Sequence, residues 1–350
     1  MKSAHVFKTS DEQFEVRIQD IPIPKPEANQ VLIRVVVSGT NPKDWKHPLR
    51  FPEASGMNTG DDIAGYVEAF GSNVTEFKVG DRVAAFHQIR TPNGSFAEYA
   101  VSWEKTTFHL PNSTSFEEAA TIPLAAMTAA VGLFCRLGIP EPWVTVSQAR
   151  KDALAGGVVV YGAASAVGAF AVKLLVRSKI HPVICVAGRG TSFVDGLIDR
   201  SQGDTVVDYR AGNDSVVAGI RAAIPQGQNL MYAFDAVSEK GSYQNITKVL
   251  DSRGHLSLVL PGQVSPETIN KTLTIVSVVH GGPDDPTDFG YAWFRLFSLG
   301  LKEGWFSGHP YEVIPGGLNG VKVGLERLQA GKASAVKYVY RIDETAGIRS

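Results

Sequence analysis

The stretch from Val158 to Gly168 constrains the fold of this chain more than any other. It reads VVVYGAASAVG: a run of mostly β-branched residues, a turn containing glycine, and the start of an apolar helix. A continuous apolar run of this kind is typical of a strand buried in a parallel sheet. The backbone amides that open the following helix, together with the helix dipole, favour an anion such as a pyrophosphate.

The turn itself is a loosened form of a dinucleotide-binding motif. The strict pattern has three glycines, whereas this chain has Gly162, Ala164 and Gly168. Taken alone, the motif is equally compatible with an ordinary strand-to-helix turn. If it binds a nucleotide, small side chains allow a close approach of the phosphates and Ser165 could donate its hydroxyl; the residues expected at the phosphates are Gly162, Ala164, Ser165, Ala166 and Val167.

Alternating strands and helices continue after this motif. Strands are predicted over 157–161, 182–187, 205–208, 231–235, 255–260 and 273–279, and helices over 166–178, 192–201, 214–223 and 240–251. Six strands joined by helical crossovers predict an α/β fold with a doubly wound parallel sheet, the Rossmann arrangement.

The segments on either side of this region have a different texture. The first hundred residues are β-rich, with strands predicted over 31–37, 63–69 and 82–86. Helical character begins at Phe116, with Ser115 as the N-cap, and a second helix is predicted from Pro123 through Thr128 to Leu137. Further helices are predicted over 291–301 and 321–329 and a last strand over 335–342, while 138–156 is predicted to be a surface connection.

Composition excludes several classes of protein. The chain has 350 residues, 44% hydrophobic and 20% charged, with a formal net charge of −1. That length allows two domains. The near-neutral net charge gives no indication of binding to nucleic acid or to a membrane surface. We expect no membrane span and no secretory signal, because neither an apolar run of about 18 residues nor a signal pattern is present. Only two cysteines, Cys135 and Cys185, occur, which favours a reducing, cytoplasmic setting.

Short motifs spread along the chain occur in the order that one superfamily shows. They are VLIRV at 31–35, NPKDWK at 41–46, GDDIAG at 60–65, GDRV at 80–83, GSFAEY at 94–99, the segment 119–123 with Thr128-Ala129, the turn at 162–168, His309-Pro310, GGL at 316–318 and GKASAVK at 331–337. On these residues the chain resembles the medium-chain dehydrogenase/reductase superfamily. The similarity is greatest to its zinc-free branch of quinone oxidoreductases and fungal trans-enoyl reductases of secondary metabolism. The resemblance implies a GroES-like catalytic domain over 1–137 and 282–350, with a Rossmann domain inserted over 138–281.

A zinc site is not expected. Zinc-dependent relatives hold the metal with Cys, His and a third ligand, but this chain has Thr40 in place of the first cysteine and Asp61-Asp62 in place of His-Glu. The eight histidines include no close-spaced pair at ligand spacing. We therefore expect a metal-free enzyme.

The second strand of the doubly wound sheet decides the choice of nucleotide. An acidic residue normally ends that strand in NAD enzymes, but here Ala187 is followed by Gly188 and Arg189. Arg189 could pair with a 2′-phosphate through its planar fork, or it could face solvent. Tyr209 matches a family tyrosine near the adenosine phosphate, although packing at a strand end would also explain it. Together these residues favour NADPH over NADH.

The resemblance also names residues for the nicotinamide end. Lys46 closes the NPKDWK motif and is expected to donate a hydrogen bond to the substrate oxygen or to contact the nicotinamide ribose; a solvated lysine is the alternative. Thr128 belongs to a Thr-Ala motif of the helix that faces the nicotinamide, or is an ordinary intrahelical hydroxyl. The other cofactor contacts implied are Pro42, Leu260, Pro261, Ser334, Ala335 and Lys337. Asp44 and Asp61 are expected to be structural hydrogen-bond acceptors.

The expected reaction is transfer of hydride from NADPH to the β-carbon of an α,β-unsaturated carbonyl compound, either small or carrier-bound. The enolate that develops needs a donor or a cation, not necessarily a metal, and no side chain is a compelling proton donor, so water could serve. Three alternatives stay open: a quinone oxidoreductase, a carbonyl reductase or alcohol dehydrogenase, and a non-enzymatic nucleotide-binding protein. The predicted strand Thr272–Val279 could pair with a second subunit to form a homodimer. Aromatic residues that could line a substrate cleft are Trp45, Phe51, Phe86, Tyr291, Trp293 and Phe294, with the loop 281–286 as its rim, although aromatic residues at such spacing are more often part of the core.

Overall fold

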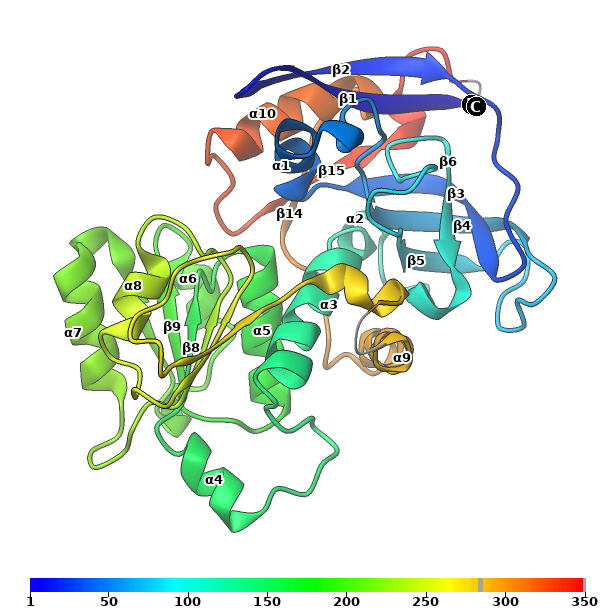
Figure 1. Cartoon of the computed structure of the whole chain (residues 1–350). Helices are drawn as coiled ribbons and strands as arrows, with labels where there is room; N and C mark the ends of the chain where they lie inside the picture. The colour runs from blue at the N-terminus through cyan, green and yellow to red at the C-terminus, as the bar shows by residue number, and fades with distance from the viewer. Residues whose placement is uncertain (283–285, 349–350) are drawn as a thin grey trace. The chain divides into compact units, whose positions relative to one another are not determined.

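The apolar run of the dinucleotide motif forms a central strand, β8 (Val158–Tyr161), whose four residues are all buried. The computed structural model (Figure 1) describes residues 1–282 and 286–348. Within it the chain divides into two units, Met1–Met127 with Ser277–Ser350, and Thr128–Val276. These boundaries fall earlier in the chain than the expected 137/138 and 281/282, because the segment after Met127 packs with the second unit.

The second unit is built on a six-stranded, fully parallel sheet in the order β10-β9-β8-β11-β12-β13. Its other strands are β9 (Val183–Ala187), β10 (Thr205–Asp208), β11 (Tyr232–Asp235), β12 (His255–Leu258) and β13 (Asn270–Leu273). Strand order reverses between β8 and β11, and ligands of such sheets bind beyond the carboxyl ends of the strands at that point. The predicted doubly wound sheet is therefore confirmed.

Helices cover both faces of this sheet. They are α5 (Ala166–Arg177), α6 (Thr191–Asp195), α7 (Asn213–Ala223) and α8 (Ser242–Thr247), whereas α4 (Gln148–Leu154) lies beyond one end of the sheet. Figure 1 shows α5 on one side of β8 and β9 and α7 with α8 on the other. The strands alternate accordingly: Val159 and Ile184 join a core cluster with Val216 and Ile220 of α7. Burial of both faces explains why β8 reads as an uninterrupted apolar run.

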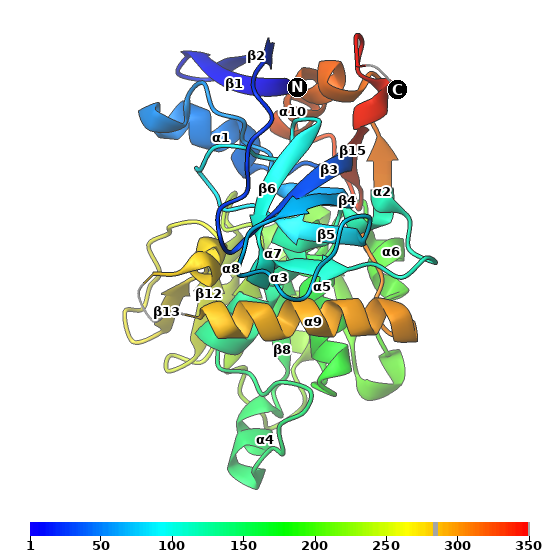
Figure 2. The same cartoon turned by 90° about the vertical axis from the view of Figure 1, so that its right-hand side faces the viewer.

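The first unit is built on a seven-stranded sheet in the order β14-β15-β3-β4-β5-β7, with β6 also paired to β3. Its strands are β3 (Gln30–Gly39), β4 (Asp62–Phe70), β5 (Arg82–Phe86), β6 (Tyr99–Trp103), β7 (Thr107–His109), β14 (Tyr311–Val313) and β15 (Lys337–Arg341). Strands β1 (Lys2–Ser10) and β2 (Gln13–Asp20) form a separate antiparallel pair. The last strand, β15, pairs antiparallel with β3, matching Val339 to Gly39 (Figure 2).

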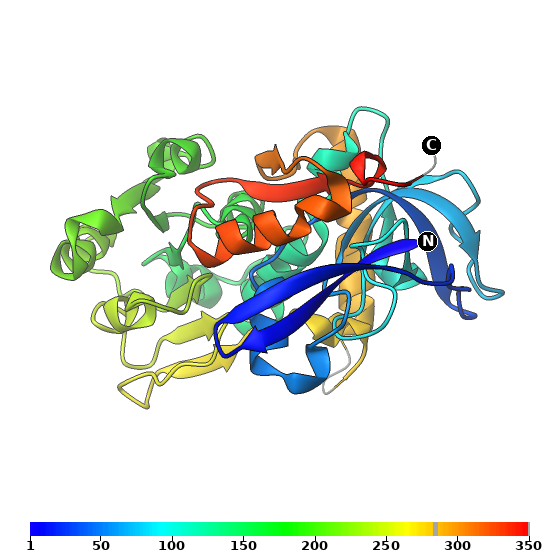
Figure 3. The same ribbon diagram turned by 90° about the horizontal axis from the view of Figure 1, so that it is seen from above.

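Helices pack around this sheet. They are α1 (Lys43–Arg50), α2 (Phe116–Ala119), α9 (Thr287–Glu303) and α10 (Val321–Gln329), with α3 (Pro123–Ala130) containing the boundary between the units. Helix α10 contacts α1 and β2, an arrangement visible from above in Figure 3. Ser115 caps α2 as expected, because its hydroxyl accepts a hydrogen bond of 3.1 Å from the amide of Glu118. Short 3-10 helices are η1 (Pro52–Ala54), η2 (Glu104–Thr106), η4 (Arg200–Gln202), η5 (Tyr209–Ala211), η6 (Val276–His280), η7 (Gly317–Gly320) and η8 (Ile342–Glu344).

One helical stretch, Phe116–Arg136, is long and apolar enough to cross a membrane by composition alone. Its most apolar window has a mean hydropathy of 1.5, but 89% of that window is buried inside the protein. The core helix of a soluble protein passes the same test, so the stretch is weak evidence for a span. It ends in a π-helix, η3 (Val131–Arg136), where a continuous α-helix to Leu137 was predicted.

Four further expectations are wrong in detail. The strand predicted over 273–279 ends at Leu273, and Val276–His280 forms η6 instead. Val276 and Val279 are the buried residues of that segment, and a spacing of three suits a 3-10 helix. The predicted helices 192–201 and 240–251 are shorter, as α6 with η4 and as α8, and the expected connection 138–156 contains α4.

Candidate functional site

The turn between β8 and α5 has the geometry of a phosphate cradle. Gly162 has φ of +77°, a conformation that L-residues with side chains rarely adopt. A Cβ on Gly168 would lie 2.2 Å from the carbonyl oxygen of Gly162, so glycine is required there for the helix to approach the turn. Ser165 caps α5 by accepting a 3.0 Å hydrogen bond from the amide of Gly168.

The amides that remain at this helix start fit a pyrophosphate. Those of Ala166 and Val167 make no hydrogen bond within the described chain, and the residues from Ala164 to Val167 are half-exposed. Unpaired amides at the start of a twelve-residue helix are the groups that an anion satisfies. The Ser165 hydroxyl retains its proton for a further acceptor.

The ends of β9 and β10 bring two of the expected nucleotide residues together. Asp208 of β10 is in register with Ala187, the last residue of β9. A Cβ on Gly188 would lie 2.5 Å from Cζ of Tyr209, so the tyrosine ring lies directly over the glycine. Arg189 follows and is exposed.

A buried carboxylate organises the loops at the next two strand ends. Asp235, the last residue of β11, accepts hydrogen bonds from the amides of Val237 (3.0 Å) and Ser238 (2.7 Å) and from the hydroxyl of Ser242 (2.5 Å). Ser238 in turn accepts from the amide of Val259, next to the expected contacts Leu260 and Pro261. Burial raises the pKa of Asp235, while these donors oppose the rise. These hydrogen bonds therefore link Asp235, at the end of β11, through Ser238 to Val259, the residue that follows β12.

Thr128 begins the second unit on α3, and 6% of it is exposed. The π-helix η3 follows it, and such segments occur frequently at functional sites. Gly132 in this segment packs on the ring of Phe234, because a Cβ there would come within 2.3 Å of the ring.

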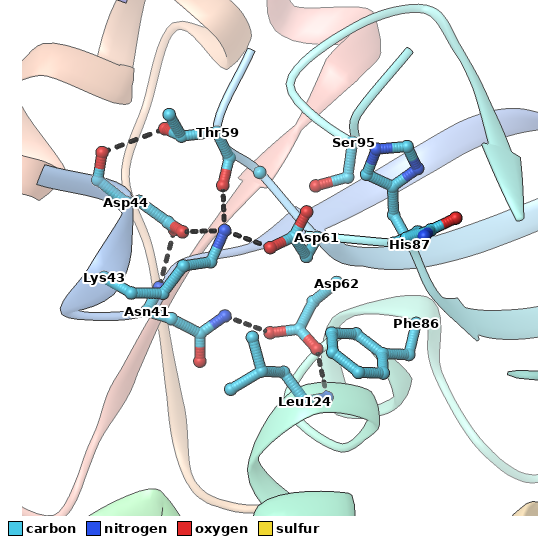
Figure 4. Close-up of polar contacts among 12 residues, drawn as sticks. Asn41, Lys43, Asp44, Thr59, Asp61, Asp62, Phe86, His87, Ser95 and Leu124 are labelled. Carbon is cyan, nitrogen blue, oxygen red and sulfur yellow. Dashed lines mark hydrogen bonds and ion pairs between the residues drawn. The ribbon is translucent and has the colours of Figure 1, made fainter. Parts of the chain in front are cut away.

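In the first unit a lysine stands between two buried carboxylates (Figure 4). Lys43 Nζ forms ion pairs with Asp44 Oδ1 (2.9 Å) and with Asp61 Oδ2, and donates to the carbonyl of Thr59. The amide of Asn41 donates to Asp44 Oδ2 at 2.7 Å. Burial raises the pKa of Asp44 to about 7 and that of Asp61 to about 6, against the opposing effect of Lys43. Both aspartates are acceptors in a structural cluster, in agreement with what the sequence favoured.

A second lysine neutralises the neighbouring carboxylate. Lys337 Nζ lies 2.5 Å from Asp62 Oδ2 and 3.1 Å from Asn41 Oδ1, and both charged side chains are almost fully buried. The amide of Leu124 donates to the other oxygen of Asp62 at 2.7 Å. Lys337 was expected at the cofactor; its ammonium group is committed to Asp62 within this unit.

The remaining expected residues of the first unit lie on α1 and before β15. Pro42 is exposed and precedes α1, and its carbonyl accepts from the amide of Lys46 at 3.2 Å. Lys46 is half-buried, with its Nζ 5.5 Å from the ring centroid of Trp45. Ser334 and Ala335 are half-exposed, and Ala335 has φ of +52°.

In zinc-dependent relatives, the positions of Thr40, Asp61 and Asp62 carry zinc ligands. Here the side chains at these positions are engaged in other interactions. The Thr40 hydroxyl donates to the carbonyl of Tyr338 at 2.9 Å, and Asp61 and Asp62 each pair with a lysine. A zinc site needs a compact set of Cys, His or carboxylate ligands. Among the described residues, no group of three or more such side chains could hold a metal ion.

Three of the six aromatic residues considered for a cleft belong to the core. Phe86, Trp293 and Phe294 have no exposed surface, and Phe294 stacks on Phe108 at a centroid distance of 5.5 Å. Tyr291 donates its hydroxyl to Glu76 at 2.8 Å. Phe86, Trp293 and Phe294 are therefore core residues, as aromatic residues at such spacing more often are, and they do not line a cleft. Residues 283–285 of the expected rim lie outside the described residues.

The sequence did not indicate that Lys43 and Lys337 pair with Asp61 and Asp62. It also did not indicate the hydrogen-bond network around Asp235. The Asp61-Asp62 pair was a usable signal, because two adjacent carboxylates that become buried each need a partner of their own. Nothing in the sequence indicated that Lys43 and Lys337, almost three hundred residues apart, would supply them.

Comparison with known proteins agrees with this geometry. Residues 27–112 match the family model of the alcohol dehydrogenase GroES-like domain. The trans-enoyl reductase fsr4 of Gibberella fujikuroi is 47% identical over 309 residues, which cover 87% of this chain and 89% of that protein. The enoyl reductase component lovC of the lovastatin nonaketide synthase of Aspergillus terreus is 28% identical, with 92% of each chain covered. The crystal structure of a mycobacterial protein, Rv1454c, complexed with NADPH has a TM-score of 0.74 at 21% identity and covers 97% of this chain and 99% of its own.

The sequence relatives, with which the fold agrees, define an oxidoreductase of the medium-chain dehydrogenase/reductase superfamily, whose members use a nicotinamide cofactor. Within that superfamily the chain belongs to the family of the fungal trans-enoyl reductases, since it shares 47% identity with one member over most of both lengths.

Proposed function

We propose that this protein is an NADPH-dependent, metal-free enoyl reductase of secondary metabolism. The observation that carries the proposal is the start of α5, where the amides of Ala166 and Val167 have no partner within the described residues, in a chain 47% identical to a trans-enoyl reductase. Gly162, Ala164 and Ser165 would receive the pyrophosphate with them. Gly188, Arg189 and Tyr209 would hold the adenosine end and its 2′-phosphate, and Leu260 and Pro261 would border the nicotinamide end.

When bound, the nicotinamide would supply hydride to the β-carbon of the unsaturated substrate. The residues assigned to the substrate oxygen are Lys46 and Thr128, whose ammonium and hydroxyl groups can donate to a developing enolate. Pro42, Ser334 and Ala335 are proposed to contact the nicotinamide ribose. Lys337 is proposed to act indirectly, because its ammonium group neutralises Asp62 beside Asn41 and Pro42.

The donor set supports a reaction without a metal. The carboxylates at the positions of the zinc ligands, Asp61 and Asp62, have Lys43 and Lys337 as counterions. A divalent ion would have to displace both ammonium groups. Lys337 would then be buried without a carboxylate and Lys43 would keep only Asp44, and an uncompensated buried charge costs several kcal/mol.

The substrate class is tested by supplying NADPH with a trans-2-enoyl thioester of a short pantetheine mimic, the same acyl group on an acyl carrier protein, a benzoquinone and a simple ketone. We expect oxidation of NADPH, followed at its absorbance band, with the thioesters and a saturated product by mass spectrometry. Turnover of the carrier-bound form alone would specify a carrier-bound substrate.

Two variants assign the donors. Lys46→Ala and Thr128→Ala are each expected to lower kcat with enoyl thioester by about 10–1,000-fold, as removal of an oxyanion donor does. Lys322→Ala, which removes an exposed lysine of α10, should keep wild-type kcat. Dialysis against a chelator should leave activity unchanged. Reduction of the quinone or ketone in preference to every thioester, or loss of activity with zinc removal, would refute the proposal.

A further inference from the structure

An ion pair at the end of β10 lies beside the expected nucleotide residues. Asp208 and Arg210 are joined by hydrogen bonds from Nε to Oδ1 (2.9 Å) and Oδ2 (3.0 Å) and from Nη2 to Oδ2 (2.5 Å). The carboxylate also caps η5 by accepting from the amide of Arg210 at 2.9 Å. Both oxygens of Asp208 are therefore engaged by one arginine.

The register of the sheet places this pair at the adenosine end of a doubly wound fold. Asp208 is in register with Ala187. The segments that follow these two residues, Tyr209-Arg210 and Gly188-Arg189, therefore begin at the carboxyl ends of adjacent parallel strands. The contact of Tyr209 with Gly188 shows that the two segments touch. In NAD enzymes an acidic residue at the end of the second strand binds the ribose hydroxyls. Here the carboxylate at this edge is Asp208 of the neighbouring strand, and its charge is neutralised by Arg210.

The guanidinium group has donors left over. It carries five N–H groups, and Nε and Nη2 serve Asp208. Nη1 has no hydrogen-bond partner within the described residues, and about half of the side chain is exposed. One edge of the fork can thus hold the carboxylate while another binds a phosphate bidentately. An ion pair between two solvent-exposed groups contributes little to stability, so the arginine can realign at little cost.

We infer that Arg210, tethered by Asp208, is a second arginine for the 2′-phosphate beside Arg189 and sets the preference for NADPH over NADH. The inference rests on the proposed use of NADPH, but it concerns a residue that the sequence motifs did not indicate. With Arg210 present the strand ends offer two guanidinium groups and one carboxylate to the nucleotide. Without it, an uncompensated Asp208 would repel a 2′-phosphate and accept from a 2′-hydroxyl.

The test measures the Kd of NADPH and of NADH by quenching of protein fluorescence, without any substrate. Arg210→Ala should weaken NADPH binding by about 10–100-fold, the value of hydrogen bonds to a charged group, and change NADH binding by less than about threefold. Arg210→Lys should fall between, since it keeps the charge and loses the fork. The affinity for 2′,5′-ADP should fall in Arg210→Ala with that for NADPH, whereas the affinity for 5′-AMP should not.

Arg200→Ala is the matched control, because Arg200 is an exposed arginine paired with Asp195 in the same unit; both affinities should stay at wild-type values. If Arg210 only stabilises η5, Arg210→Ala lowers the unfolding temperature and leaves the NADPH-to-NADH ratio unchanged, which overturns the inference. A wild-type protein that binds NADPH tightly while only Arg189→Ala alters the ratio refutes this inference alone. A wild-type protein that binds neither nucleotide refutes the proposed function as well.

Discussion

At the scale of single residues, the glycines of the turn between β8 and α5 lie where neighbouring atoms leave no space for a Cβ atom. Gly168 lies against the carbonyl of Gly162, and Gly162 against Val237 Cγ2, where its Cβ would approach to 2.3 Å. The sequence identified these glycines through the motif. It could not show that Gly188 is required for a different reason, the tyrosine ring above it, because that contact joins two strands whose register no local pattern fixes.

Gly168→Ala is expected to destabilise the fold by about 1–3 kcal/mol, as overpacking does, and to abolish tight NADPH binding, because the start of α5 must move. Urea denaturation and nucleotide titration measure both. Gly196→Ala is the control, since the nearest atom to its Cβ is 3.4 Å away. A Gly168→Ala variant as stable as Gly196→Ala and equally able to bind NADPH would contradict the assignment.

The buried aspartates give the stability a pH dependence. Burial raises the pKa of Asp44 to about 7 and of Asp61 to about 6, above the unfolded value near 4. The folded state then binds protons more tightly than the unfolded state, so their contribution makes the free energy of unfolding fall as pH rises from about 4 to about 7. In Asp44→Asn this fall should shrink, by about 1.4 kcal/mol for each pKa unit removed, and the variant should be the more stable protein at pH 8.

Urea denaturation between pH 4.5 and 8 checks this prediction. Asp343→Asn, a change to an exposed carboxylate, should follow the wild-type profile. Parallel profiles of wild type and Asp44→Asn would show that the cluster does not take up a proton in this range.

At the scale of elements, strands and helices with strong patterns were predictable and irregular segments were not. The ranges 82–86, 205–208 and 321–329 agree with β5, β10 and α10 to the residue. The failures lie where tertiary packing overrides propensity. The segment 272–279 is rich in β-branched residues, but the strand that includes its start, β13, ends at Leu273. A homodimer contact along this segment would therefore involve an edge strand of only four residues. No local sequence pattern predicts that β15 pairs with β3. For the same reason, the ion pair between Lys337 of β15 and Asp62 could not be predicted.

Lys337→Met tests what β15 contributes through that ion pair. It leaves Asp62 buried beside Asn41 without a cation, which is expected to cost about 3–5 kcal/mol of stability. Adding Asp62→Asn to the same chain should recover a large part of the loss, because no unpaired charge remains. Urea denaturation of both variants, with Lys322→Met as an exposed control, makes the measurement; a loss in Lys337→Met no greater than in the control would refute the argument.

At the scale of the whole molecule, the sequence sufficed for the class of fold, because ordered motifs cover most of the chain. Helix α3 contains the division of the chain between Met127 and Thr128 without any change of composition, so no sequence pattern marks that point. The proposed nucleotide site divides in the same way: the glycine turn proposed to bind the phosphates is a local pattern that the sequence shows, whereas the ion pairs of the first unit depend on partners far away in the chain.

Ligand linkage tests the molecule as one system. NADPH at a hundred times its Kd should raise the free energy of unfolding by about 2.7 kcal/mol, provided that only the folded state binds it. Thermal unfolding should therefore shift upward with NADPH and less with the same concentration of NADH. Equal shifts would remove the basis for a 2′-phosphate site.

The return of the last strand to the first sheet has a consequence for biosynthesis. On the ribosome every strand from β8 to β13 is available before β15 has been translated, so the parallel sheet can assemble while the nascent chain is still growing. Strand β3 can pair with β4 and β6 early, but its residues 37–39 must wait for β15, and Asp62 for its counterion, until the end of translation. A product truncated before Lys337 should therefore be a target of chaperones and proteases in its first unit, while its second unit is already folded.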